Sequence, residues 1–109
     1  MDELGKDTAA QLAYELAEDP DGSPVVRLKG ELDMTTSPRL EAAVAPIIAT
    51  SPARLVVDAR ELEFADSSAI ALLVRWANLV RQVEIRQPPD LLRRVIARMG
   101  LSDRLQVSP

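Results

Sequence analysis

Three consecutive residues, Asp66, Ser67 and Ser68, are the part of this chain best placed to do chemistry. An apolar run ends shortly before them, and a helical pattern from Ile70 to Val80 follows. Their side-chain oxygens can accept hydrogen bonds from the first free N–H groups of that helix. A hydroxyl there also faces the positive end of the helix dipole. On spacing alone, the serines could be a helix cap, a nucleophile or a site of modification.

The composition removes several classes of catalytic site. The 109 residues include no cysteine and no histidine, which excludes thiolate metal sites, disulfides, and Ser-His-Asp or Cys-His catalysis. The chain also lacks a glycine-rich nucleophile elbow and a Gly-x-x-x-x-Gly-Lys phosphate loop. We therefore expect a protein that is not an enzyme, with no catalytic residue and no cofactor.

Length and charge narrow the class further. We expect one domain over residues 10–109, preceded by a flexible N-terminus at residues 1–9. The net charge of −4 argues against nucleic-acid binding. No apolar run has the ~20 residues of a membrane helix, and no signal peptide follows Met1, so we expect no membrane insertion and a cytoplasmic location.

Charge is uneven along the chain. Residues 1–22 hold seven acidic side chains, whereas residues 71–109 hold seven arginines. Solvated helix faces explain this most simply. The alternative is a polarised molecule that docks in one orientation on a charged partner.

Hydrophobic periodicity predicts an alternation of strands and helices. The expected helices begin at Pro38, Ile70 and Asp90, and Pro46 should kink the first one or end it near Ala45. Gly100 suits a left-handed C-cap of the third helix. The expected strands are residues 11–16, 25–29, 54–59, 83–86 and 105–107.

The order of these elements predicts an α/β fold. The first two strands flank the turn Asp19–Pro24 and form a hairpin. Three strands carry polar residues at alternate positions, so one face of the sheet should be more solvated than in a doubly wound fold. Right-handed crossovers that add each strand on the same side place the helices together. We therefore predict a mixed β-sheet opened by an antiparallel hairpin, with helices mostly on one face.

Three pieces of sequence, taken in their order and spacing, look like a STAS domain of the anti-anti-sigma factor type, the SpoIIAA-like family. The resemblance covers roughly residues 10–107. The pieces are Gly30-Glu31-Leu32-Asp33, then Val56-Val57-Asp58 followed by Phe64-Ala65-Asp66-Ser67-Ser68, then Pro89-Asp90-Leu91-Leu92-Arg93-Arg94-Val95 followed by Gly100-Leu101.

The resemblance implies a protein-binding switch. The unphosphorylated domain would bind an anti-sigma factor, itself a GHKL-type serine kinase, and so free a sigma factor for transcription. The kinase would phosphorylate the serine after the aspartate, which is Ser67 here, and a phosphatase would reset it. Because the loop after the second strand and the start of the helix should lie at one end of the sheet, we expect partner contacts there. The expected contact residues are Asp33, Thr35, Asp66, Ser67 and Ser68.

This sequence departs from the family pattern twice. Ala69 stands where the family usually has glycine, and the glycine-containing turn before the fourth strand is replaced by Arg81-Gln82-Val83. The second departure implies a shortened loop, an earlier helix end or a degraded fourth strand. A second reading of the family resemblance is a STAS subunit of a stressosome or a lipid-transport ATPase complex, in which Ser67 is never modified. A weak homodimer is also left open.

The carboxylates near the motif have simpler interpretations. Asp33 could stabilise its own loop as readily as contact a partner, and Asp58 reads as a local hydrogen-bond acceptor at a strand end. Asp33, Asp58 and Asp66 together could also form a magnesium-binding cluster like that of a receiver domain. Receivers also need a lysine beyond the sheet, and this chain has none after Lys29, so we expect no metal.

Overall fold

The computed structural model describes residues 11–109, so the flexible segment expected at residues 1–9 lies outside the described residues. The elements are β1 (Leu12–Glu18), β2 (Pro24–Leu32), α2 (Ser37–Ile48), β3 (Arg54–Ala65), α3 (Ser67–Leu79), β4 (Gln82–Arg86), α4 (Asp90–Arg98) and β5 (Leu105–Ser108). The strands form one sheet in the order β1-β2-β3-β4-β5. β1 is antiparallel to β2, and every later pair is parallel. The predicted mixed sheet with an opening hairpin is confirmed.

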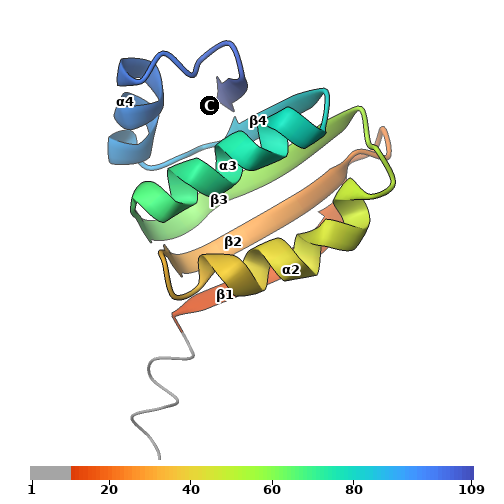
Figure 1. Ribbon diagram of the computed structural model, residues 1–109, viewed down its shortest axis with the longest axis horizontal. Helices are drawn as coiled ribbons and strands as arrows, with labels where there is room; N and C mark the ends of the chain where they lie inside the picture. The colour runs from red at the N-terminus through yellow and green to blue at the C-terminus, as the bar shows by residue number, and fades with distance from the viewer. Residues whose placement is uncertain (1–10) are drawn as a thin grey trace, which may run out of the picture.

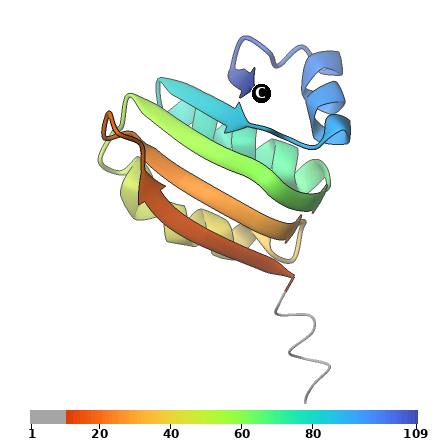
Figure 2. The ribbon, with the colours of Figure 1, turned by 180° about the vertical axis from the view of Figure 1, so that it is seen from behind.

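Of the three helices in the described part of the chain, α2 and α3 cover one face of the sheet, in agreement with the prediction of helices mostly on one face. Figure 1 shows α2 and α3 across the front of the strands, with α4 beyond α3 near the edge formed by β4 and β5. From behind, the strands stand in front of α2 and α3 and no helix crosses them (Figure 2). No helix in residues 11–109 is long and apolar enough to cross a membrane.

The core lies between the sheet and α2 and α3. The central strand β3 contributes Leu55 and Val57 to this core, and Val56, on the opposite face of the sheet, is also fully buried, as the apolar run predicts. Strand register places Val26, Val57 and Ile85 side by side on the helix side. Hydrophobic burial there fixes the register, because a slip by one residue would turn each of these side chains to the other face.

The uncovered face of the sheet carries ion pairs instead of a helix. Asp19, at the β1–β2 turn, accepts hydrogen bonds from Arg86 at 3.1 Å and Arg54 at 3.3 Å. Its hydrogen bond with Arg86 lowers the pKa of the Asp19 carboxyl. Glu84 lies between the same two arginines. Part of the acidic N-terminal segment is therefore neutralised by arginines of later strands within the domain itself.

Two boundaries differ from the sequence-based prediction. The third strand does not end at Ala59 but continues to Ala65, because residues 61–65 pair through their backbone with the end of β2. α2 does not end near Ala45 but runs through Pro46 to Ile48. Proline in the last turn removes only the bond to the carbonyl of Ala42, and Pro46 itself is exposed. Ile47 and Ile48 still pack against the core, which favours continuing the helix.

The unusual turn before β4 leaves that strand intact. α3 ends at Leu79, and β4 begins three residues later at Gln82, so the missing glycine corresponds to a shortened loop. Farther along, Gly100 has a φ of 70°, and Leu101 N–H donates to the carbonyl of Ile96 at 3.1 Å. This is the predicted left-handed cap at the end of α4.

Candidate functional site

The loop after β2 and the start of α3 meet at one end of the sheet. β2 and β3 run parallel up to the pair Leu32 and Ala65, where both strands end. The backbone N–H of Asp66 donates to the carbonyl of Leu32 at 3.2 Å. The sheet thus brings the loop of Asp33 and Thr35 beside Asp66, Ser67 and Ser68, as the order of the strands predicts.

Asp66, and neither serine, is the N-cap of α3. Its backbone is extended, and its Oδ1 accepts a hydrogen bond from the N–H of Ser68 at 2.8 Å. Ser67 occupies the first helical position and is exposed, while Ser68 is half-buried. Within residues 11–109 the Ser67 hydroxyl makes no hydrogen bond. The interpretation of Ser67 as a helix cap is therefore wrong, and its hydroxyl is free to react or to contact a partner.

Asp33 holds the neighbouring loop together. Its Oδ1 accepts hydrogen bonds from the hydroxyl of Thr35 at 2.7 Å, from the N–H of Thr35 at 2.9 Å and from the N–H of Thr36 at 3.1 Å. The Thr36 hydroxyl in turn accepts from the N–H of Asp33 and donates to the carbonyl of Glu31. These bonds lower the pKa of the Asp33 carboxyl, the Thr35 hydroxyl having the largest effect. Asp33 is thus the loop-stabilising acid that the sequence suggested.

Replacing Asp33 should therefore lower stability measurably. We expect Asp33→Ala to reduce the free energy of unfolding by about 1 kcal/mol, the usual contribution of such side-chain hydrogen bonds, and Asp33→Asn by less, because asparagine keeps one accepting oxygen. The folded carboxyl has a lowered pKa, so its stabilisation is present above the unfolded pKa of about 3.9 and lost as the pH falls through the folded pKa. Urea unfolding at pH 7 and pH 3 checks both points. A difference between wild type and Asp33→Asn that grew on acidification would contradict this assignment.

The magnesium interpretation is not supported by the positions of the aspartates. Asp58 lies inside β3, eight residues before Asp66, which is roughly 25 Å along an extended strand. It is buried, and it accepts a hydrogen bond from the N–H of Arg60 at 3.1 Å. Asp58 is therefore the local hydrogen-bond acceptor that the sequence predicts. It lies within the strand, however, and the prediction that it lies at a strand end is wrong. No cluster of metal-binding side chains occurs among the described residues.

Two exposed apolar residues at this end of the sheet were not predicted from the sequence. Met34, in the loop after β2, is 71% exposed, and Phe64, near the end of β3, is 49% exposed. For Met34 the signal was available, since an apolar residue within an otherwise polar loop has no core to fill. Ala69, by contrast, is fully buried, so the methyl group that replaces the usual glycine hydrogen points into the core. It leaves the surface around Ser67 unobstructed.

Comparison with known proteins gives the class to which this fold and site belong. The family model described as "Mlab, STAS domain" matches residues 4–107, which is nearly the whole chain. The chain belongs to the STAS domain family.

Two similar proteins carry the name anti-sigma factor antagonist. Anti-sigma-F factor antagonist RsfB of Mycobacterium tuberculosis is 31% identical over 64 residues, covering 59% of this chain and 52% of that protein. The match thus spans about half the length of this curated relative. The crystal structure of an anti-sigma factor antagonist from Mycobacterium paratuberculosis is 31% identical, with a TM-score of 0.79, and covers 90% of this chain and 86% of that chain.

A more distant structure shares the fold. The anti-sigma factor antagonist SpoIIAA in its unphosphorylated form has a TM-score of 0.74 at 22% identity, with 89% of each chain covered. At this identity the likeness establishes the SpoIIAA-like fold and nothing further.

Proposed function

We propose that this chain is an anti-sigma factor antagonist whose binding to its anti-sigma factor is switched off by phosphorylation of Ser67. One observation carries the proposal: Ser67 is exposed at the first position of α3, with its hydroxyl unused by the cap. The partner would be a GHKL-type serine kinase acting in the cytoplasm, where transcription takes place, and a phosphatase would restore the binding form. The chain itself would be a binding protein and not an enzyme.

The surroundings of Ser67 suit a binding surface that a phosphate could control. Asp33, Thr35, Asp66, Ser67 and Ser68 lie at one end of the sheet, and we assign partner contact to them. Exposed Met34 and Phe64 add apolar area near the same end. Exposed apolar side chains beside polar groups are typical of protein interfaces. A solved structure of a protein named an anti-sigma factor antagonist shares this fold at 31% identity, and a curated relative of that name is 31% identical over 64 residues.

Phosphorylation by the cognate anti-sigma factor is the direct test. Incubation with that protein and ATP should add one phosphate to the wild-type chain, detected by intact mass and located by peptide sequencing. Ser67→Ala should remain unmodified, whereas the matched variant Ser68→Ala should still accept the phosphate. A phosphate on Ser68 would contradict the assignment of the acceptor.

The alternative function predicts a different result. A STAS subunit of a stressosome or a lipid-transport ATPase complex would bind its partner without modification of Ser67. Binding of an anti-sigma factor with no phosphate transfer under any nucleotide condition would favour a constitutive partner. An absence of binding would overturn the antagonist function itself.

A further inference from the structure

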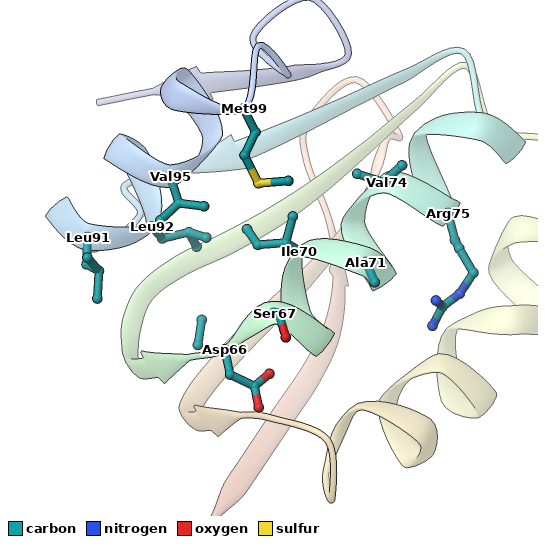
Figure 3. A pocket seen from close by; sticks show the side chains of 11 residues that line it. Asp66, Ser67, Ile70, Ala71, Val74, Arg75, Leu91, Leu92, Val95 and Met99 are labelled. Atoms are coloured by element: carbon teal, nitrogen blue, oxygen red, sulfur yellow. The ribbon is translucent and has the colours of Figure 1, made fainter.

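A groove of about 600 Å³ lies between α3 and α4 and opens beside Ser67. Figure 3 shows Ile70 and Val74 of α3 facing Leu92 and Val95 of α4 across it, together with Met99, which directly follows α4. Asp66 and Ser67 line one end, so the groove adjoins the proposed partner-binding residues. Its volume falls within the range of about 300–1,000 Å³ that is typical of ligand pockets.

The groove exists because α4 packs through only part of its apolar stripe. Leu92 and Ile96 are the buried residues of α4. Leu91 and Met99, on the groove side, are 64% and 58% exposed. Opposite them α3 presents the small side chain of Ala71, which does not fill the space. Exposed leucine and methionine around a concave apolar surface mark a place where another molecule docks.

The outer rim of the groove on α4 is basic. With 3.6 residues per turn, Arg98 lies about 20° and Arg94 about 60° around the helix from Leu91, on the side away from buried Ile96. Both arginines are exposed, and within residues 11–109 neither makes an ion pair. An apolar occupant with acidic neighbours would match this rim in charge.

We infer that the groove receives apolar side chains from an acidic segment of the anti-sigma factor, which anchors the complex next to Ser67. The inference rests on the proposed function and deepens it by naming the surface that supplies the binding energy. Leu91 and Met99 close over the inserted side chains, and Arg94 and Arg98 face the acidic residues beside them. A phosphate on Ser67 then lies at the end of the groove, where binding of the partner removes water. Burying a dianion there without a matching cation costs free energy and weakens the complex.

The test uses a matched pair of leucines. Leu91 and Leu79 are equally exposed, at 64% and 63%, but Leu79 lies at the far end of α3 and outside the groove. Leu91→Gln should weaken binding of the anti-sigma factor about tenfold or more, whereas Leu79→Gln should leave affinity unchanged. Calorimetric titration without ATP keeps Ser67 unmodified during the measurement. Thermal unfolding of both variants shows that each is folded.

A second variant fills the groove instead of weakening its rim. Ala71 is exposed, so Ala71→Trp adds bulk to the lining without removing a core contact. The control is Ala97→Trp, at an exposed position of α4 that does not line the groove. Ala71→Trp should reduce affinity by at least about tenfold and Ala97→Trp should not.

The outcomes separate the two proposals. If wild type binds and Ser67→Asp weakens binding, but the Leu91 and Leu79 variants are indistinguishable, the groove inference fails and the proposed function stands. If wild type does not bind any anti-sigma factor, both fail. If Leu91→Gln changes only self-association in ultracentrifugation, the groove is a contact between copies of this chain, and the inference is overturned.

Discussion

Ser67→Asp is expected to lose more than a hundredfold in affinity for the anti-sigma factor, while Ser67→Ala binds as wild type does. The aspartate mimics phosphoserine, which carries about 1.5 to 2 negative charges at pH 7, with a single negative charge. At the first position of α3 the helix dipole favours that charge by about 0.3–1 kcal/mol if it remains exposed, and the carboxylate of Asp66 opposes it. These effects partly offset each other within the free domain, so it stays folded.

Burial against a partner changes that balance. A charge that enters an interface without a matching cation costs several kcal/mol, and a loss of ~3 kcal/mol corresponds to more than a hundredfold in affinity. Calorimetric titration of the two variants, with circular dichroism to verify folding, measures the effect. Ser102→Asp controls for net charge, because exposed Ser102 lies before β5, at the opposite end of the parallel strands from Ser67. Equal affinities for Ser67→Ala and Ser67→Asp would refute the switch.

The architecture could be predicted because its main determinants are local. The turn Asp19–Pro24 specifies the hairpin through residue types that adopt turn conformations. The apolar run Leu55-Val56-Val57 indicates a central strand, since both of its faces are buried. Gly100 marks the end of α4 because the cap needs a positive φ. Each of these signals is complete within a few residues of sequence.

The missed boundaries depend on contacts between segments distant in sequence. The extension of β3 to Ala65 comes from backbone pairing with the end of β2, and backbone pairing leaves little trace in a polar stretch such as Arg60-Glu61. The persistence of α2 through Pro46 depends on where Ile47 and Ile48 pack. Propensity alone favoured the opposite outcome in both places, and tertiary packing outweighed it.

The sequence predicted which residues make up the site but not the role of each residue within it. Strand order alone brings Asp33 and Asp66 to one end of the sheet. Sequence could not decide whether Asp66 or a serine caps α3, since all three residue types suit the position. The groove could not be predicted from the sequence either, because it depends on how far α4 packs from α3. Hydrophobic periodicity predicts that Leu91 and Met99 lie in the core, whereas both are exposed at the rim of the groove.

Gly30 holds the start of β1 against the end of β2. Its φ is 105°, and the register of β2 with β3 shifts directly after it, which is a β-bulge. The carbonyl of Gln11 lies over it and accepts a hydrogen bond from the N–H of Glu31 at 2.6 Å. A Cβ at position 30 would lie 2.1 Å from that carbonyl oxygen, so the backbone of one strand would have to move.

Gly30→Ala should therefore be strongly destabilising, by about 2–5 kcal/mol, since a left-handed φ costs about 1–3 kcal/mol and overpacking against backbone costs a similar amount. Gly22→Ala separates the two contributions, because Gly22 has a φ of 88° but nothing within 4 Å of an added Cβ. Gly22→Ala should lower the free energy of unfolding only by the cost of a left-handed φ. Urea unfolding of both variants gives the comparison, and the difference between them measures the contact with Gln11. If the two variants were equally stable, β1 would yield to the added methyl group at no cost, and the close packing of Gly30 on Gln11 would not contribute to stability.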